Sequence, residues 1–122
     1  YSSKNKKKRG IILRLGNVEI VRDWGWAPDY VKAIWLMMQR NKPRDFIIGS
    51  GKTHSLKDFV NEVFRYLKIS KKNLKTNVSK YKRKIDLRGY KANIADTQKI
   101  LKWKPKLRFK TIIHKMINNE LF

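Results

Sequence analysis

Apolar residues recur at helical spacing in four stretches of the chain. The clearest stretch follows Ser55 and carries an apolar stripe up to Leu67, which predicts an amphipathic helix. Asp58 stands three residues after Ser55, so the pair forms a variant of the capping box that starts a helix. A second helix is predicted from Pro28 to about Asn41. Its apolar residues, together with Met37, are expected to face the core: Val31, Ile34, Trp35 and Met38.

Two shorter helices are predicted near the end of the chain, over residues 94–101 and from Phe109 onward. Short β-prone runs separate the helices, at residues 11–15, 18–24, 45–48 and 74–78. This order of strands and helices indicates an α/β domain in which a small sheet is covered by helices. Residues 1–9 show no periodicity and are predicted to form a basic flexible tail, so the folded domain is expected to span residues 10–122.

The composition is typical of a small soluble domain. The 122 residues fit one domain. An apolar content of 41% argues that the chain as a whole is not a disordered basic tail. The absence of cysteine excludes a disulfide scaffold, a thiolate metal site and a cysteine nucleophile. No apolar run approaches the ~18 residues of a membrane span, and no signal peptide opens the chain, so we expect a cytoplasmic protein with no membrane partner.

The net charge of +22, from 31 Lys and Arg against 9 Asp and Glu, first suggests a nucleic-acid partner. However, 22 of the basic residues are lysine, and the chain also holds 13 Ile and 9 Asn, a bias that AT-rich codons alone would produce. The charge is also spread along the chain and is dense only at residues 4–9 and 68–91. Most aromatic residues occupy predicted core positions and are not interleaved with basic residues as stacking platforms would be. Nucleic acid is therefore not the expected partner.

The sequence lacks the patterns that a catalytic site requires. His54 precedes a predicted helix and His114 lies within one, so both are expected to be structural. Residues 49–53 (Gly-Ser-Gly-Lys-Thr) end like a phosphate-binding loop, but that motif requires glycine where Phe46 stands. No glycine-rich dinucleotide turn and no metal-ligand spacing is present. The chain alone is predicted to be non-catalytic and to bind no metal.

Two stretches carry patterns that generic packing does not explain. Residues 15–31 read Leu-Gly-Asn-Val-Glu-Ile-Val-Arg-Asp-Trp-Gly-Trp-Ala-Pro-Asp-Tyr-Val, and residues 81–87 read Tyr-Lys-Arg-Lys-Ile-Asp-Leu. Gly-Lys-Thr-His-Ser follows at 51–55, and Trp-Lys-Pro, which is common to a wider family, at 103–105. From about residue 10 to its end, the chain thereby resembles the C-terminal part of the GDP-mannose 4,6-dehydratases, a family of extended short-chain dehydrogenases/reductases.

The resemblance implies roles for four residues. Arg22 and Arg83 would bind the diphosphate of a nucleotide-sugar, Asp86 would accept hydrogen bonds from the ribose hydroxyls, and Asn17 would lie beside the nucleotide. A guanidinium is a rigid fork of donors suited to phosphate oxygens, whereas a carboxylate suits a vicinal diol. The family pattern Arg-Pro-x-Glu is changed here, because Lys84 replaces the proline and Asp86 is one methylene shorter than glutamate. A turn-forming role explains Asn17 equally well.

The resemblance also implies that catalysis requires residues upstream of this chain. The family's glycine-rich NADP turn and its Tyr-x-x-x-Lys pair belong to an N-terminal Rossmann domain, and Tyr1 is followed four residues later by Asn5 rather than lysine. In the intact enzyme NADP takes hydride from C4 of mannose, water leaves across C5 and C6, and hydride returns to C6, giving GDP-4-keto-6-deoxy-mannose. The intact lyase is expected to be an oligomer.

We therefore expect this chain to be the C-terminal substrate-binding domain of such an enzyme, an α/β fold that lacks the Rossmann domain. It would bind GDP-mannose or a similar nucleotide-sugar, bind no NADP and be inactive by itself. Two alternatives remain open. One is a related nucleotide-sugar epimerase, dehydratase or reductase domain that recognises another base or sugar. The other is a basic nucleic-acid-binding module, whose affinity would fall steeply with salt.

Overall fold

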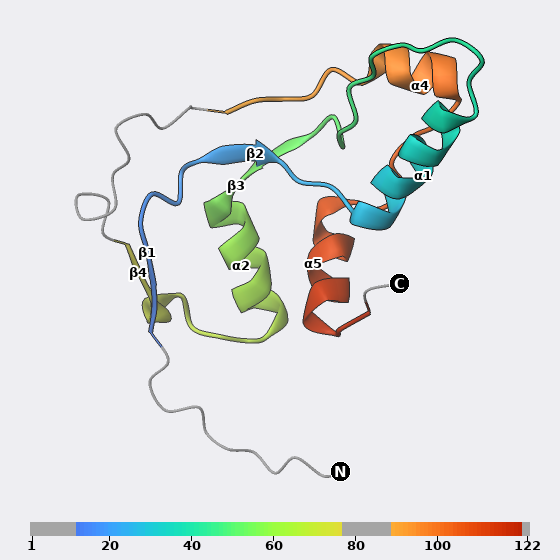
Figure 1. Cartoon of the computed structure of the whole chain (residues 1–122). Coiled ribbons are helices and arrows are strands. Elements are labelled where there is room, and N and C mark those ends of the chain that lie inside the picture. The colour runs from blue at the N-terminus through green and yellow to red at the C-terminus, as the bar shows by residue number, and fades with distance from the viewer. Residues whose placement is uncertain (1–11, 77–88, 121–122) are drawn as a thin grey trace.

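Figure 1 shows the computed structural model of the chain, which describes residues 12–76 and 89–120. Within these ranges the elements are, in order, β1 (Leu13–Leu15), β2 (Val21–Asp23), α1 (Ala27–Met38), β3 (Thr53–Ser55), α2 (Leu56–Tyr66), the 3₁₀ helix η1 (Lys71–Asn73), β4 (Leu74–Thr76), α4 (Ala95–Leu101) and α5 (Phe109–Ile117). The described strands form two pairs, β1 with β4 in parallel and β2 with β3 antiparallel. The predicted α/β class is confirmed, and the small sheet is divided into these two pairs.

Helix α2 begins directly after strand β3, through the capping box that the sequence predicts. The Ser55 hydroxyl accepts a hydrogen bond from the Asp58 backbone N–H (3.0 Å), and the Asp58 carboxylate accepts one from the Ser55 backbone N–H (2.9 Å). The pKa of Asp58 is lowered, mainly by the hydrogen bond from the Ser55 backbone N–H and next by the hydrogen bond with the Ser55 side chain. The buried face of α2 then packs against α5 through four buried apolar side chains: Val60, Phe64, Ile112 and Ile113.

A second core lies between helices α1 and α4. It is centred on Ala33, Leu101 and Trp103, all buried, with these partly buried residues around them: Tyr30, Leu36, Met37, Phe46 and Ile48. The buried carboxylate of Asp29, in the first turn of α1, accepts hydrogen bonds from the backbone N–H groups of Lys106 (2.8 Å) and Leu107 (3.1 Å). Asp29 therefore fixes the segment that leads into α5, far along the chain from α1.

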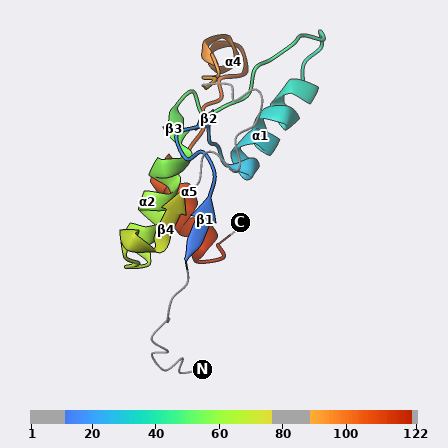
Figure 2. The same ribbon diagram turned by 90° about the vertical axis from the view of Figure 1, so that its left-hand side faces the viewer.

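The two helix pairs lie at different places along the molecule. Figures 1 and 2 both show α1 beside α4 and α2 beside α5, with the β2–β3 pair at the start of α2. Among the described residues, no helix is long and apolar enough to cross a membrane.

The apolar stripe of α1 does not face the core, contrary to the sequence-based expectation. The exposed fractions are 63% for Val31, 48% for Ile34, 59% for Trp35 and 77% for Met38. The opposite face of the helix enters the core instead, led by fully buried Ala33. Met37 packs against that core, so its assignment is confirmed, whereas those of Trp35 and Met38 are wrong. Helical spacing gives α1 two apolar faces, and only tertiary packing decides which of them is covered.

Residues 45–48 form no strand, although the sequence predicts one there. Phe46 and Ile48 pack against the α1–α4 core, and the Thr97 hydroxyl donates a hydrogen bond to the Ile47 carbonyl oxygen (2.8 Å). No described segment lies alongside this run as a strand partner. Without such a partner the run forms no strand, although its residues favour the extended conformation. Helix α1 also ends at Met38, three residues before the predicted end.

Candidate functional site

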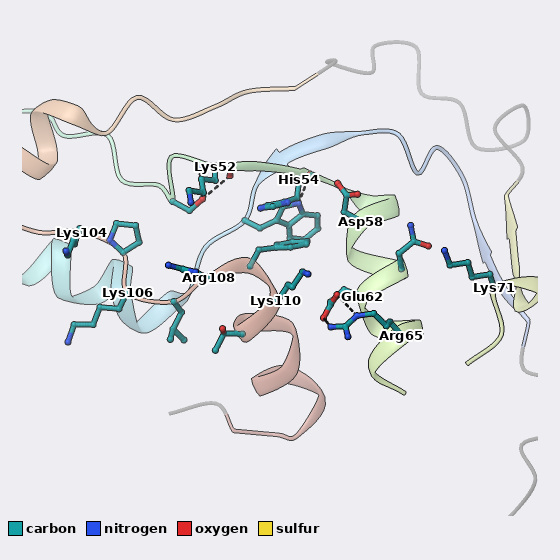
Figure 3. Close-up of a pocket in the computed structure, with 17 residues that line it drawn as sticks. Lys52, His54, Asp58, Glu62, Arg65, Lys71, Lys104, Lys106, Arg108 and Lys110 are labelled. Atoms are coloured by element: carbon teal, nitrogen blue, oxygen red, sulfur yellow. Dashed lines mark hydrogen bonds and ion pairs between the residues drawn. The ribbon is translucent and has the colours of Figure 1, made fainter. Parts of the chain in front are cut away.

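A basic groove of about 1280 Å³ opens beside β3, between helix α2 and the segment that enters α5 (Figure 3). Asp58 and Glu62 are the acidic residues of its lining. Seven basic side chains line it: Lys52, Arg65, Lys71, Lys104, Lys106, Arg108 and Lys110. Such an excess of positive charge in one concave surface raises the local concentration of anions. We call this surface the basic groove.

Four of the seven cations come from one continuous segment, residues 104–110, which has no regular secondary structure up to residue 108 and enters α5 at Phe109. Along it, residues 104, 106, 108 and 110 are basic and exposed, whereas 105, 107 and 109 are partly buried. Over residues 104–108 this alternation has the period of two that extended chains show, so it presents Lys104, Lys106 and Arg108 on one side. Lys110 follows in the first turn of α5. These basic residues are solvent-exposed, as the sequence predicts, but the fold gathers them on one surface. The alternation of Lys or Arg with apolar residues is the sequence signal that was missed.

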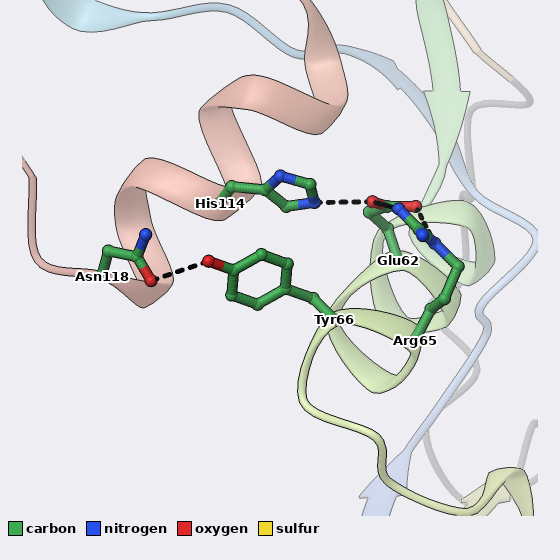
Figure 4. A network of polar contacts seen from close by, with 5 residues as sticks. All are labelled: Glu62, Arg65, Tyr66, His114 and Asn118. Atoms are coloured by element: carbon green, nitrogen blue, oxygen red, sulfur yellow. Dashed lines mark hydrogen bonds and ion pairs between the residues drawn. The ribbon is translucent and has the colours of Figure 1, made fainter.

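The two acidic residues of the groove are both engaged within the protein. Asp58 serves the capping box of α2. Glu62 is buried, contacts the Arg65 guanidinium and accepts a hydrogen bond from His114 Nε2 at 2.7 Å (Figure 4). Hydrogen bonding to Arg65, followed by that to His114, lowers the pKa of Glu62 to about 2. Both carboxylates therefore stay ionised, and Glu62 is paired with Arg65, one of the seven cations. The lining still carries a formal net charge of 7 − 2 = +5.

Aromatic rings form a wall of the groove next to strand β3. The His54 ring stacks on Phe109 with centroids 3.9 Å apart, and Trp24 stacks on Phe59 at 5.1 Å. The Trp24 indole N–H donates a hydrogen bond to the His54 carbonyl oxygen (2.9 Å), which joins the two stacks. His54 is thus held by packing, in agreement with its predicted structural role. The wall also shows aromatic rings next to basic residues, a juxtaposition that linear spacing did not reveal.

Arg22 lies on strand β2, directly opposite His54 of β3. Residues that face each other across an antiparallel pair project from the same side of the sheet. The partly buried Arg22 side chain is therefore on the side of the β2–β3 pair that carries His54, a residue of the groove lining. Its Nη1 donates a hydrogen bond to the Val21 carbonyl oxygen (2.8 Å). The structure places Arg22 beside the basic groove, although Arg22 is not one of the lining residues.

Of the other three predicted site residues, only Asn17 lies in the part of the chain that the structure describes. The Asn17 carboxamide oxygen accepts a hydrogen bond from the Glu19 backbone N–H (3.0 Å), so Asn17 supports the turn before buried Val18. Asn17 is absent from the groove lining. Arg83 and Asp86 lie outside the described residues.

The glycine-rich turn at residues 49–51 is occupied by an internal carboxylate. The backbone N–H groups of Ser50 and Gly51 donate to the Asp23 carboxylate, at 2.7 and 2.9 Å. These two amides are thus already used and are not available to a phosphate group. Within residues 12–76 and 89–120, no cluster of His, Asp or Glu could hold a metal ion.

Comparisons with known proteins agree on one family. A family model described as GDP-mannose 4,6 dehydratase matches residues 2–116. The chain is 34% identical to GDP-mannose 4,6 dehydratase 1 of Arabidopsis thaliana over 109 residues, which cover 89% of this chain and 30% of that protein. It is 34% identical to GDP-mannose 4,6 dehydratase of Dictyostelium discoideum over 130 residues, covering 93% and 36%. The chain thus spans about a third of the length of these relatives.

Solved structures of the same fold belong to enzymes that act on sugar nucleotides. The dTDP-glucose 4,6-dehydratase of Bacillus anthracis, in complex with NAD, superposes with a TM-score of 0.77 at 22% identity, over 89% of this chain and 34% of that one. The UDP-glucose 4-epimerase of Thermotoga maritima, with UDP-glucose, superposes with a TM-score of 0.74 at 22% identity, over 93% and 37%. At this identity the likeness establishes the fold alone.

Proposed function

This chain belongs to the GDP-mannose 4,6-dehydratase family, and from that premise we propose that it is the part of such an enzyme that binds the nucleotide-sugar substrate, GDP-mannose. The observation that carries the proposal is the position of Arg22, inside the family match and on the side of the β2–β3 pair that borders the basic groove. A diphosphate carries the charge that such a surface attracts, and a guanidinium binds phosphate oxygens in a fixed geometry.

The other site residues keep the roles that the family resemblance implies. We propose that Arg83 is the second arginine on the diphosphate and that Asp86 accepts hydrogen bonds from the ribose hydroxyls. Asn17 would lie beside the nucleotide, and its carboxamide oxygen also accepts a hydrogen bond from the Glu19 backbone N–H in the turn that precedes β2. The three residues lie within the family match.

This chain does not fit NADP, the cofactor that the family implies. The backbone N–H groups of the turn at residues 49–51 donate to the Asp23 carboxylate, and the sequence contains no dinucleotide-binding turn. We therefore propose that the chain contributes substrate recognition, and that cofactor binding and catalysis require residues outside it.

Replacing Arg22 with glutamine tests the role of this residue in substrate binding. We expect the Kd for GDP-mannose to rise at least about tenfold, because a charge-assisted hydrogen bond to phosphate is lost. Binding is measured by calorimetry and by NMR titration of the whole 122-residue chain. Arg40→Gln is the matched control, since Arg40 is an exposed arginine just beyond the end of α1.

The same binding measurements distinguish a GDP-mannose-binding domain from a domain that binds another sugar nucleotide. Unchanged NMR spectra at millimolar GDP-mannose, or equal losses in both variants, would reject the proposal. Tighter binding of UDP-glucose than of GDP-mannose would show that the chain belongs to an enzyme for another sugar nucleotide.

The basic groove supports one further candidate, the binding of a nucleic-acid strand. Its seven cations and its aromatic wall are the two features that single-stranded nucleic acid requires. In that case, oligonucleotide affinity would persist at about 0.2 M salt and fall linearly on a log–log plot against salt. GDP-mannose would then have no effect on the spectra.

A further inference from the structure

The segment that enters α5 presents a regular series of cations along the basic groove. Lys104, Lys106 and Arg108 are exposed and line the groove, and Figure 3 shows them following one another along this segment. The residues between and beside them are buried or partly buried: Trp103, Pro105, Leu107 and Phe109. In an extended chain, side chains on one side repeat every two residues, about 6.7 Å apart. We call residues 104, 106 and 108 the cation row.

The backbone of the cation row is held in place by the rest of the fold. The buried Trp103 indole N–H donates a hydrogen bond to the Asp29 carbonyl oxygen (3.1 Å). The Asp29 carboxylate accepts hydrogen bonds from the backbone N–H groups of Lys106 (2.8 Å) and Leu107 (3.1 Å). A surface whose backbone is already ordered loses less conformational entropy when it binds a ligand. The cation row is therefore preorganised for binding.

Acidic side chains of the protein do not neutralise the cation row. Within residues 12–76 and 89–120, its three cations form no ion pair with a carboxylate. The two acidic residues of the groove are engaged elsewhere, because Glu62 contacts Arg65 and His114 and Asp58 caps α2. The row thus presents a line of positive charge to an external ligand.

We propose that the basic groove binds an extended acidic segment of a partner protein through the cation row. An extended peptide with Asp or Glu at every second residue repeats its charges at the same spacing of about 6.7 Å, so three ion pairs form in register. Lys52, before β3, and Lys71, beyond α2, add positive charge to the lining. Such complementarity speeds association and sets the orientation of the partner. The inference goes beyond the proposed function, because Arg22 is not one of the lining residues.

Single-stranded nucleic acid fits the groove less well than an acidic peptide. Binding of such a strand depends on bases that stack on aromatic side chains. The rings of the aromatic wall stack on one another instead, His54 on Phe109 with 6° between their planes and Trp24 on Phe59 with 30°. The ring faces joined in these stacks are not available to bases. The groove thus offers a nucleic acid its charge but little stacking.

Two synthetic peptides of equal length, composition and charge test the register. One repeats Glu-Ser six times, and the other repeats Glu-Glu-Ser-Ser three times. In the second peptide, acidic residues on one side of an extended chain recur only at every fourth residue. We expect the whole 122-residue chain to bind the alternating peptide about fivefold more tightly, because about two more exposed ion pairs form in register. Fluorescence anisotropy at about 0.1 M salt measures both Kd values.

Variants of the chain show whether the cation row carries this preference. The row triple replaces three residues with glutamine: Lys104, Lys106 and Arg108. We expect it to raise the Kd for the alternating peptide about tenfold and to abolish the difference between the two peptides. The control triple removes the same number of charges from exposed lysines outside the groove, and it should keep the preference: Lys32, Lys42 and Lys99. Circular dichroism verifies that both variants are folded.

Four outcomes would overturn the inference. Equal binding of the two peptides, or equal losses in the two triples, would show that only the total charge attracts them. Tighter binding of an oligothymidylate with six phosphates than of the alternating peptide would assign the groove to nucleic acid. An equal loss of GDP-mannose binding in the row triple would assign the row to the diphosphate of the substrate. A chain that binds GDP-mannose but neither peptide would reject this inference and leave the proposed function intact.

Discussion

Glu62 shows how one buried carboxylate is retained in a strongly basic protein. Its side chain is buried between α2 and α5, where Arg65 and His114 contact it from the two helices, and Tyr66 stacks on the His114 ring at 4.2 Å. The Tyr66 hydroxyl donates a hydrogen bond to the Asn118 carboxamide oxygen (3.0 Å) and so extends the network to the end of α5 (Figure 4). Glu62 therefore links the two helices that border the basic groove.

Replacing Glu62 with glutamine should destabilise the protein in a pH-dependent way. The folded pKa of about 2 is below the ordinary value of ~4.3, so the stabilisation is complete above about pH 5 and is lost as the pH falls toward 2. We expect Glu62→Gln to lower the free energy of unfolding by about 1–3 kcal/mol near pH 7, because it weakens buried charge-assisted bonds. Urea denaturation at about pH 7, 5 and 3 should show the difference from the unmodified chain shrinking with acidity.

Glu19→Gln is the control for that series. Glu19 is exposed and pairs with Lys57 at 3.0 Å, and exposed pairs contribute little, so its effect should remain within about 0.5 kcal/mol. An equal loss for Glu62→Gln at acid and neutral pH would contradict the assigned role of the charge.

At the scale of elements, the junction of β3 and α2 shows local sequence controlling tertiary position. Ser55 is both the last residue of β3, opposite Val21, and the N-cap of α2. Backbone bonds from Leu56 N–H to the Ile20 carbonyl oxygen (2.9 Å) and from Lys57 N–H to the Val18 carbonyl oxygen (2.8 Å) then attach the helix start to the chain before β2. The cap therefore fixes the angle at which α2 leaves the strand pair that carries Arg22.

Replacing Ser55 with alanine should lower the free energy of unfolding by about 1 kcal/mol, because the Asp58 backbone N–H loses its acceptor. Ser70→Ala is a matched control: Ser70 caps only the three-residue η1, and its substitution should cost less than about 0.5 kcal/mol. Urea denaturation measures both. Equal losses would show that the capping box of α2 has no special weight.

At the scale of the whole molecule, the fold gathers a charge that the sequence spreads out. Cations that are far apart in the chain, from Lys52 to Lys110, meet in the basic groove. Buried Asp29 makes this possible, since it holds the backbone of residues 106 and 107 against α1. The mutual repulsion of these cations is a cost of the folded state that salt screens.

Removing groove cations should therefore stabilise the protein at low salt. We expect the triple variant Lys104→Gln, Lys106→Gln and Lys110→Gln to raise the Tm by about 3 °C at about 0.01 M salt and to lose this gain near 0.2 M. The control triple replaces exposed lysines outside the groove with glutamine: Lys32, Lys42 and Lys99. Differential scanning calorimetry measures the Tm. Equal gains in both triples would show that repulsion arises from the total charge and not from its concentration in the groove.

The sequence by itself determined the helices, the start of α2, the α/β class and the family. Each depends on residues that are near one another in the chain, or on motifs read in order, so spacing and caps suffice. Only the tertiary structure decided which face of α1 is buried, that residues 45–48 lack a strand partner, and that the cations form one groove. These features depend on contacts between distant segments, such as that of Asp29 with Lys106 and Leu107, and no local pattern encodes them.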